Sequence, residues 1–340
     1  MVGVCRLFTT VATLTPLLIA VLVPRSPLVA WSVAQIVVSV WPWPVAAVHE
    51  WEAWAWDQWQ AAESAEPRPP LQVPELAIGA VPSDLSTPFI IRGLLNGSRA
   101  LEGFGGPEWL LEPPVADLEV DFFSDASAKL AVVPNARGRL GDVVASIFAG
   151  GSQKIGTEII FRRFPELLDA LGVLQLLAPV FGGAHFRQAY LGSTLTVPVF
   201  VGRGSEEGRL IRTDLHCEPI GNAMLMLAGR KHWTLVSPAQ SQVLRPSISP
   251  DGRAYFLSRL TGPPNDFAAH AVRYQVETRA GDVLWVPTWT WHRVDYVPGV
   301  SAVSASLFHF KAGQLAALNP LFAGLLLPNL AKELVGWKTQ

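Results

Sequence analysis

Two histidines and one glutamate have the types and spacing of metal ligands. His216 and Glu218 are two residues apart in TDLHCEPIGN, so on an extended strand both side chains leave from the same face. His292 closes the apolar and aromatic run GDVLWVPTWTWHRV, where a polar ring needs a partner, and it is the candidate third ligand. Two imidazoles and one carboxylate can bind a divalent transition metal and leave coordination positions open.

A lysine close to these residues in sequence is expected to face an anion. Lys231 follows the turn at 228–230, and strict alternation along a strand places it on one face with Trp233 and Leu235. If that face points inward, the buried ammonium costs several kcal/mol unless it meets an anion. A carboxylate cosubstrate would supply the anion, and the alternative is a solvated lysine at a hairpin end.

The elements that must position these residues are mostly strands. Beyond residue 186 the chain consists of short apolar segments separated by Gly and Pro turns, which predicts an antiparallel sandwich or barrel. A helical pattern at 164–176 precedes them, so the fold class is α+β. The expected strands cover residues 195–202, 223–227, 232–236, 274–278, 283–287 and 300–310, and a short buried strand lies near residue 88.

The first 62 residues form a separate apolar, tryptophan-rich segment. Residues 7–23 resemble the apolar region of a signal peptide, and 26–48 is about as long as a membrane-spanning helix requires. Residues 49–62 mix tryptophan with acidic residues, which suits a helix at a membrane surface. The expectation is a signal or membrane anchor, in a membrane-associated or secretory-pathway protein. The alternative is a helix packed on the globular domain of an intracellular protein.

A small-residue pattern at 32–34 leaves it open whether residues 1–48 are cleaved or span a membrane, and the orientation is open too. Residues 63–84 are expected to be a Pro-rich linker, and residues 85–312 the main domain. Residues 313–340 are expected to be a helical extension broken by Pro320 and Pro328. This extension could dimerise, cover the barrel or contact a membrane.

Composition excludes several classes of protein. The 340 residues are 50% hydrophobic and 16% charged, with a net charge of −2, so an intrinsically disordered chain is excluded. Residues 49–312 contain no long uncharged apolar run, which excludes a polytopic membrane protein. The chain has no basic stretch, which argues against nucleic-acid binding. Cys5 and Cys217 cannot form a disulfide framework or a zinc finger.

Two segments, GRLIRTDLHCEPIGNAMLMLAGRKHWTLVSP and RAGDVLWVPTWTWHRVDY, resemble the JmjC-domain (cupin-8-like) Fe(II)- and 2-oxoglutarate-dependent oxygenases, closest to the small hydroxylase branch. PFIIRGLL near residue 88 is similar to the opening strand of that branch, so the resemblance covers roughly residues 85–312. It implies a double-stranded β-helix (cupin or jelly-roll) barrel with N-terminal helices. It also implies Fe(II), 2-oxoglutarate as cosubstrate, and O2-dependent hydroxylation of a protein side chain, with demethylation as the less expected reaction.

The resemblance implies a role for each matching residue. His216, Glu218 and His292 would be the iron ligands. Lys231 would bind the distal carboxylate of 2-oxoglutarate, with a hydrogen bond from Thr213, and Asn222 would lie beside the cosubstrate. Strict alternation places Thr213 on the face opposite to His216, so its role requires a bulge or a turn between them.

The chain departs from the family pattern at three positions. Glu218 stands where this branch usually has aspartate, Leu227 where a glutamine is common, and Ser306 is the nearest match to an asparagine on the last core strand. Trp285 and Trp291, with Trp289 between them, are candidate walls of the site, against the alternative that they are packed core aromatics.

These departures leave a second function open, a catalytically silent cupin-fold binding module tethered at a membrane. The intact set of metal ligands favours the enzyme. The expected partners are a protein substrate and O2, with no nucleic acid. Related hydroxylases also suggest a homodimer through the C-terminal helices.

Overall fold

The structure is a computed structural model that describes residues 27–40, 50, 52–57, 69–80, 85–125, 134–178, 194–206, 211–249, 254–260, 271–310 and 312–334. The chain divides into two compact units. Unit 1 combines residues 1–67, 241–270 and 321–340, and unit 2 combines residues 68–240 and 271–320. All the candidate site residues belong to unit 2.

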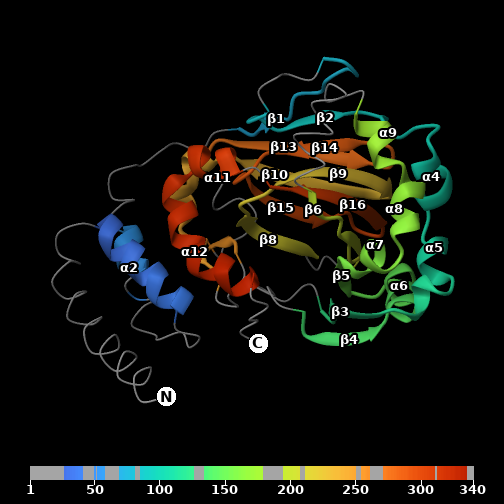
Figure 1. Cartoon of the computed structure of the whole chain (residues 1–340), viewed down its shortest axis with the longest axis horizontal. Helices are drawn as coiled ribbons and strands as arrows, with labels where there is room; N and C mark the ends of the chain where they lie inside the picture. Colours follow the sequence, from blue (N-terminus) through green and yellow to red (C-terminus); the bar gives the residue numbers. More distant parts are fainter. Residues whose placement is uncertain are drawn as a thin grey trace. The chain divides into compact units, whose positions relative to one another are not determined.

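Unit 2 is built from two β-sheets (Figure 1). Within this unit the first sheet has the strand order β1-β13-β10-β15-β8, and the second has β2-β14-β9-β16-β7-β5-β3-β4, with β6 also on β16. The first sheet contains β1 (Leu71–Gln72), β8 (Arg212–Cys217), β10 (Arg230–Val236), β13 (Arg273–Arg279) and β15 (Trp291–Tyr296). The second contains β2 (Phe89–Ile91), β3 (Glu119–Phe123), β4 (Ala136–Arg139), β5 (Lys154–Thr157), β6 (Thr194–Thr196), β7 (Val199–Arg203), β9 (Gly221–Ala228), β14 (Val283–Val286) and β16 (Ser301–His309).

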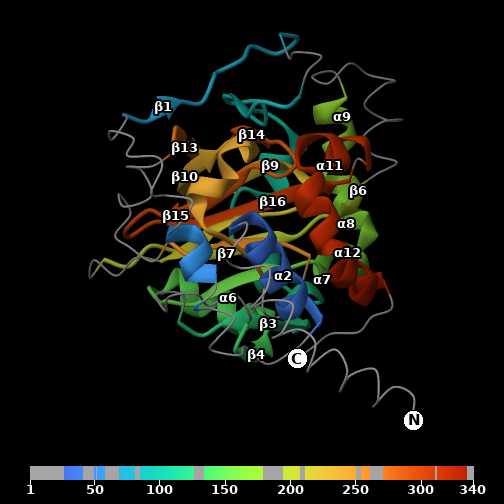
Figure 2. The ribbon, with the colours of Figure 1, turned by 90° about the vertical axis from the view of Figure 1, so that its left-hand side faces the viewer.

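Strands that follow one another along the chain cross between the two sheets. β7 and β9 lie in the second sheet while β8 and β10 lie in the first, and the return path through β13, β14, β15 and β16 crosses in the same way. The crossings produce two antiparallel faces, β8-β15-β10-β13 and β7-β16-β9-β14 (Figures 1 and 2). This connectivity is that of a jelly roll, and it agrees with the expected α+β fold.

The second sheet separates two apolar clusters. One fills the space between the sheets, and it includes Met224 and Met226 of β9. The other includes Ala223 and Leu225 of β9 and lies on the opposite face, under the helices. Because β9 is buried on both faces, its sequence is apolar throughout instead of alternating. The covering elements are α4 (Arg99–Phe104), α5 (Glu108–Leu111), η1 (Val115–Asp117), α6 (Leu140–Phe148), α7 (Ile159–Arg163), α8 (Pro165–Leu171) and α9 (Val173–Leu177).

The turn from β9 to β10 explains how Lys231 enters the interior. Gly229 has φ +73°, and a Cβ atom there would lie 2.0 Å from the carbonyl oxygen of Ser301. This turn therefore requires glycine. It starts β10 with Arg230 facing solvent and Lys231 buried, on one face with Trp233 and Leu235, as strict alternation predicts.

The helices differ in detail from the sequence-based expectation. The single helix expected at 164–176 is divided into α8 and α9 by Gly172, which has φ +66°. In the C-terminal extension α11 (Ala312–Leu318) ends before Pro320, but α12 (Pro320–Leu334) continues through Pro328. Pro320 can begin a helix because the first turn needs no backbone donor. Within the expected linker, residues 71–72 form strand β1, which pairs in parallel with β13.

Unit 1 joins segments that are far apart in sequence. Helix α2 (Pro27–Val40) places Trp31 against the rings of Trp56, Phe256 and Phe322, with centroid separations of 5.6, 6.3 and 6.0 Å. The Trp31 Nε1 atom donates a hydrogen bond to the carbonyl oxygen of Pro246. Strands β11 (Pro246–Ile248) and β12 (Phe256–Ser258) form an antiparallel pair here. Residues 241–270, expected in the main domain, thus belong to the same unit as α2.

The N-terminal expectations are only partly covered by the described residues. Residues 7–23 lie outside them, and within 26–48 the structure describes the 14-residue helix α2. Over the part of the chain that is described, no helix is both long enough and apolar enough to span a membrane.

Candidate metal and cosubstrate site

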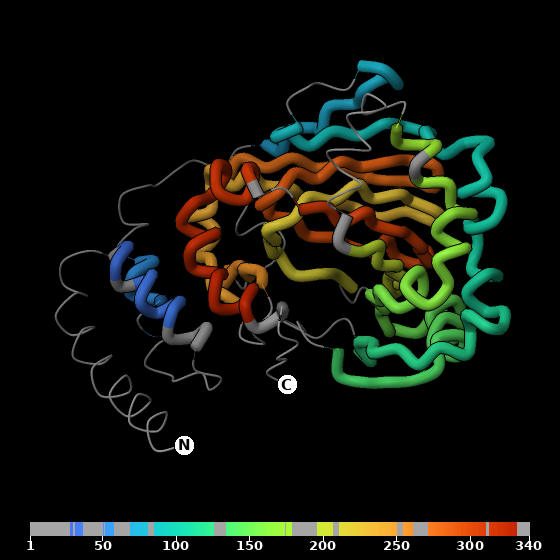
Figure 3. Tube along the Cα trace, viewed as in Figure 1, coloured from blue at the N-terminus to red at the C-terminus, as the bar shows by residue number. Residues whose placement is uncertain are grey.

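The three candidate metal ligands come from two neighbouring strands of the first sheet. His216 of β8 and His292 of β15 are directly paired in the antiparallel register, and their ring centroids are 4.2 Å apart. Glu218 follows β8 directly, where the chain turns back into β9 (Figure 3). Potential ligand atoms of the three residues all lie within 4.8 Å of one another, so one metal ion can contact all of them.

Both histidines are held in the tautomer that suits a metal ligand. Nδ1 of His216 lies 2.7 Å from the carbonyl oxygen of Asp214, and Nδ1 of His292 lies 2.9 Å from that of Thr290. A carbonyl oxygen can only accept a hydrogen bond, so Nδ1 carries the proton in each ring. Nε2 of each ring then carries the lone pair that can coordinate a metal.

The surroundings keep both imidazoles neutral near pH 7. Burial lowers the pKa of His216 to about 4, although its backbone hydrogen bond opposes this. Burial, together with the proximity of His216, lowers the pKa of His292 to about 3, although its backbone hydrogen bond opposes this. Because a metal must displace any proton from its ligand nitrogen, neutral rings favour metal binding.

The turn before β15 is linked to the backbone at Glu218. The amide of Trp289 donates a hydrogen bond to the carbonyl oxygen of Glu218 at 3.0 Å. Trp289 has φ +63°, an unusual value for a bulky side chain, and its fully buried indole donates to the carbonyl oxygen of Leu315. A strained residue that the surrounding structure holds in place often marks a functional site, and this one connects the segments that carry Glu218 and His292.

Lys231 projects from β10 into the space between the two sheets. It is 2% exposed, and its ammonium donates a hydrogen bond to Ser304 Oγ at 2.7 Å. The Nζ atom also lies 5.1 Å from the ring centroid of Tyr296 and 5.8 Å from that of Phe200. Burial lowers the pKa of Lys231 to about 7. Among the described residues no carboxylate forms an ion pair with this ammonium.

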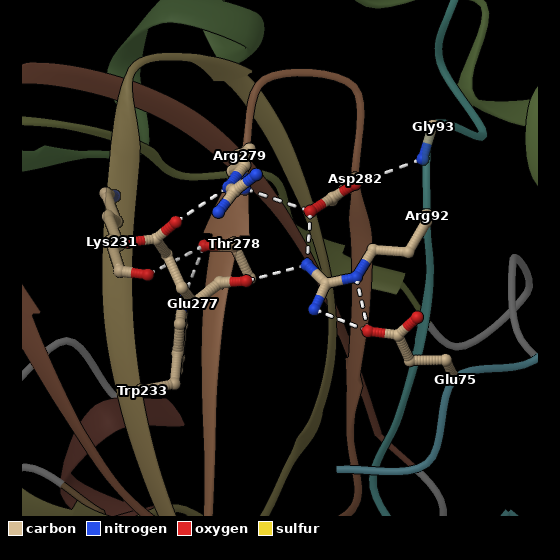
Figure 4. Close-up of polar contacts among 9 residues, drawn as sticks. All are labelled: Glu75, Arg92, Gly93, Lys231, Trp233, Glu277, Thr278, Arg279 and Asp282. Atoms are coloured by element: carbon tan, nitrogen blue, oxygen red, sulfur yellow. Dashed lines mark hydrogen bonds and ion pairs between the residues drawn. The ribbon is translucent and has the colours of Figure 1, made fainter. Parts of the chain in front are cut away.

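The backbone of Lys231 is fixed from the adjacent strand. The hydroxyl of Thr278 donates a hydrogen bond to the Lys231 carbonyl oxygen and accepts one from the indole of Trp233, as Figure 4 shows. Trp233 lies on the inner face of β10, and its ring centroid is 6.2 Å from that of His292. The lysine and an aromatic neighbour of the metal ligands are therefore positioned by one side chain of β13.

Thr213 lies on β8 next to an irregularity in the pairing of β8 with β15. His292 pairs with His216 while Val294 pairs with Thr213, so β8 contains one more residue than β15 over this stretch. This is the bulge that the expected role of Thr213 requires. Its hydroxyl accepts a hydrogen bond from the Val294 amide at 3.0 Å, and its own proton can still be donated.

Asn222 and Ser306 are both buried on the second sheet. Asn222 alternates with Met224 and Met226, so it lies on the interior face of β9. Its side-chain Oδ1 is buried and accepts no hydrogen bond from any described residue. An unsatisfied buried carbonyl oxygen of this kind needs a partner. Ser306 follows Ser304 on β16 at the spacing that shares a face.

The two candidate wall tryptophans are not brought to this site. Trp285 belongs to the cluster beneath the helices, where its ring stacks on His309 at 4.7 Å and its indole donates to Leu85. Trp291 is fully buried but precedes His292 on β15, so its side chain leaves from the opposite face. Leu227 likewise lies in the cluster beneath the helices. An apolar run does not reveal which of two buried faces a residue takes.

Two side chains around the site were not predicted from the sequence. Ser304 contacts Lys231, and its spacing from Ser306 was the signal that could have identified it. Lys154 is a second buried lysine, on β5, and its charge acts on Lys231 and on His216. The four-residue length of β5 gave no periodicity from which to assign its face.

Comparison with known protein families supports the cupin-like fold. A family model described as the cupin-like domain matches residues 156–311. The matched segment is less than half of the chain, and it contains the three candidate metal ligands and Lys231. No curated protein matches the chain at a significant level.

Proposed function

We propose that this protein is an Fe(II)- and 2-oxoglutarate-dependent dioxygenase of the JmjC type that hydroxylates a protein side chain. The proposal depends on one observation: a His216–Glu218–His292 cluster and a buried lysine, Lys231, occur in the same jelly roll, and no carboxylate among the described residues pairs with this lysine. The cluster suits a metal, and the lysine suits the carboxylate of a cosubstrate.

The donor set agrees with divalent iron. Two neutral imidazole nitrogens and one carboxylate oxygen, all within 4.8 Å, match the arrangement used by non-haem iron oxygenases, which leaves positions open for other ligands. Zinc enzymes also use two histidines and a glutamate. Lys231 favours iron with a 2-oxo acid because a simple hydrolytic zinc site has no need for a buried ammonium. When bound, the iron would supply the oxidative chemistry.

The side chains around the cluster would bind and orient 2-oxoglutarate. The Lys231 ammonium would hold the distal carboxylate, with Ser304 fixing the position of its Nζ atom. Thr213 would donate its hydroxyl proton to the cosubstrate, and the unsatisfied Oδ1 of Asn222 would accept a hydrogen bond beside it. The apolar interior would exclude water from the reacting groups.

The solvent exposure of two candidate ligands supports a protein as the substrate. His216 and Glu218 both retain some solvent exposure, whereas His292 is buried at 8%. The His216–Glu218 side of the cluster is therefore the side that a substrate can approach. A protein side chain that enters from there would reach the metal without the rest of that protein entering the barrel.

Oxygenase activity is tested with the full chain. Anaerobic addition of Fe(II) and 2-oxoglutarate should produce a weak visible charge-transfer band, and admission of O2 should produce succinate. Proteins from a cell extract should gain 16 Da with the wild type and not with His292→Ala. The matched control is His232→Ala, because this histidine is exposed on the outer face of β10. If the wild type produced no visible band and no succinate, the proposal would be contradicted.

The same experiment separates the enzyme from a silent binding module. A module without activity would bind metal and 2-oxoglutarate, or neither, and form no succinate under any condition. The departure at Leu227, which suggested such a module, lies on the face away from the interior, so it gives that alternative little support.

A further inference from the structure

Lys154 is a second lysine whose side chain points into the interior of the jelly roll. Its neighbour Ile155 belongs to the cluster beneath the helices, so Lys154 and Gly156 lie on the opposite, inner face of β5. A Cβ atom on Gly156 would lie 2.9 Å from the ring of Phe200, which also faces inward. Lys154 is 6% exposed, so its side chain is almost completely enclosed.

The side chains of Lys154 and Lys231 cross the interior in opposite directions. Lys154 leaves the second sheet, and its Nζ atom donates a hydrogen bond at 3.2 Å to the carbonyl oxygen of Arg212 on β8 in the first sheet. Lys231 leaves the first sheet and reaches Ser304 on β16 in the second. Arg212 directly precedes Thr213, so the Lys154 ammonium lies at the strand segment that also carries the metal ligand His216.

Aromatic rings lie next to both lysines. Nζ of Lys154 is 4.4 Å from the ring centroid of Phe123, and Nζ of Lys231 is 5.1 Å from that of Tyr296. The Tyr296 ring also lies against Gly202 of β7, which is paired with Lys154, because a Cβ atom on Gly202 would lie 2.6 Å from it. In agreement with this proximity, the charge of Lys154 lowers the pKa of Lys231.

In the part of the chain that the structure describes, neither lysine forms an ion pair with a carboxylate. The acid whose charge acts on Lys154 is Asp214, and this carboxylate is 3.3 Å from Arg212. Burial lowers the pKa of Lys154 to about 8. Two buried cations without a counter-ion are costly, and a dianion would remove that cost.

We propose that Lys154 is a second cosubstrate-binding residue, which together with Lys231 makes the interior selective for a dicarboxylate over a monocarboxylate. The identity of the dicarboxylate as 2-oxoglutarate depends on the proposed function. The two-cation site itself depends on the burial of both lysines and on their hydrogen bonds to Arg212 and Ser304. Lys154 binds and orients the cosubstrate and takes no part in bond making.

The test compares binding of 2-oxoglutarate with binding of 2-oxobutyrate, which has no distal carboxylate. Affinities are measured by calorimetry under nitrogen at pH 6.5 with saturating Mn(II), on wild type, Lys154→Met and Lys154→Arg. The wild type is expected to prefer 2-oxoglutarate. Lys154→Met should weaken 2-oxoglutarate binding about tenfold or more, while 2-oxobutyrate binding changes little. Lys154→Arg should keep most of the preference because it keeps the charge.

Three controls make the result decisive. Arg163→Met removes an exposed cation of α7 and should change neither affinity. Mn(II) binding by each variant shows whether the metal site is intact. The ratio of the two affinities separates binding from folding, because a general structural defect weakens both ligands alike. If Lys154→Met does not fold, Lys154→Gln and Lys154→Arg carry the same comparison.

The outcomes also distinguish this inference from the proposed function. An unchanged affinity ratio in Lys154→Met, or no dicarboxylate preference in the wild type, overturns the role of Lys154 even if the enzyme forms succinate. A preference that depends on Lys154, in a protein that forms no succinate, supports the two-cation site and overturns the oxygenase.

Discussion

At the residue scale, Glu218 is the candidate ligand at which this chain departs from its expected relatives. Aspartate has the same carboxylate on a side chain shorter by one methylene, and alanine has none. Glu218→Asp should keep Mn(II) affinity within about tenfold. Removal of a residue that only supports a metal ligand typically lowers metal affinity roughly 10- to 100-fold. Glu218→Ala removes the ligand itself, so its Mn(II) affinity should fall by at least that factor. Calorimetric titration of the chelator-treated protein measures both.

The control for this substitution is His232→Ala, whose ring is half exposed and lies on the other face of β10. It should bind Mn(II) as the wild type does. Equal affinity in Glu218→Ala and wild type would show that the carboxylate is not a ligand.

Lys231 leads to a prediction about how stability depends on pH. Its pKa is lowered from 10.5 to about 7 in the folded protein by burial. Below pH 7 it is charged in both states, so the folded state carries the full burial cost. Between pH 7 and 10.5 the unfolded state binds more protons, so stability rises with pH. Relative to Lys231→Met, the wild type should therefore gain a few kcal/mol across this interval.

Urea unfolding of both proteins at pH 6.5, 8 and 9.5 measures this gain. Taking the difference between wild type and Lys231→Met cancels the contribution of the other titrating groups. A difference that stays constant over this range would mean that Lys231 is not buried as an unpaired ammonium. Saturating 2-oxoglutarate should reduce the pH dependence, because a bound carboxylate keeps the lysine charged.

Sequence patterns located the residues of the site better than they located its walls. The spacing of His216 and Glu218 and the parity of Lys231 with Trp233 follow from strand geometry. In the structure His216 and Glu218 lie close to His292, with Glu218 just beyond the end of β8, and Lys231 is buried. Trp285 was misplaced because both faces of β14 are buried, so its apolar sequence contains no alternation from which a face could be inferred.

At the element scale, Asp282 joins three strands where the chain passes from the first sheet to the second. Its buried carboxylate accepts hydrogen bonds from the amide of Gly93 after β2, from the amide of Arg279 on β13 and from the guanidinium of Arg92 (Figure 4). Asp282→Ala would leave the two amides without this acceptor, while the Arg92 guanidinium would keep its hydrogen bonds to Glu75 and to the Glu277 carbonyl oxygen. We expect a loss of about 2–4 kcal/mol in the free energy of unfolding.

Glu75→Ala is the matched control, because Glu75 binds the same guanidinium at 2.8 Å but is 59% exposed. It should cost less than about 1 kcal/mol. Both values come from urea unfolding at pH 7. Similar losses from the two substitutions would mean that Asp282 contributes no more than a surface ion pair.

The strands followed from the sequence more directly than their registers did. Gly and Pro turns separate the strands beyond residue 186. The six strands expected in that region lie near the residues where strands occur in the structure. The bulge in β8 beside Thr213 is set by pairing with β15, about 80 residues away along the chain. Local sequence contains no information about that pairing.

At the scale of the whole molecule, the two compact units do not follow the order of the segments expected from the sequence. The expected leader and the expected C-terminal extension both contribute to unit 1, together with an insertion between β10 and β13. Tryptophan-rich composition indicated a membrane surface, but the ring of Trp31 packs against other aromatic rings within unit 1. Composition does not distinguish these cases, because both environments favour the same side chains. The homodimer through the C-terminal helices stays a prediction.

The buried polar contacts of unit 1 specify how α2 is placed within it. Gln35 donates a hydrogen bond to the Glu52 carboxylate at 2.5 Å and accepts one from the Ile248 amide at 2.6 Å. Glu52 is also 3.8 Å from Arg259. These contacts join α2 to residues 52–57 and to the insertion, so unit 1 depends on the N-terminal segment for its fold.

Trp31→Ala tests this dependence. The indole is 1% exposed, so its removal should leave a cavity and cost unit 1 about 3–5 kcal/mol. Leu28→Ala, at a 41% exposed position of the same helix, should change stability by about 0.5 kcal/mol or less. Hydrogen exchange followed by mass spectrometry should show faster exchange in 241–249 and 321–334 for Trp31→Ala. Residues 221–236 in unit 2 should be unchanged, because the two units are separately compact; equal acceleration there would mean that both units unfold together.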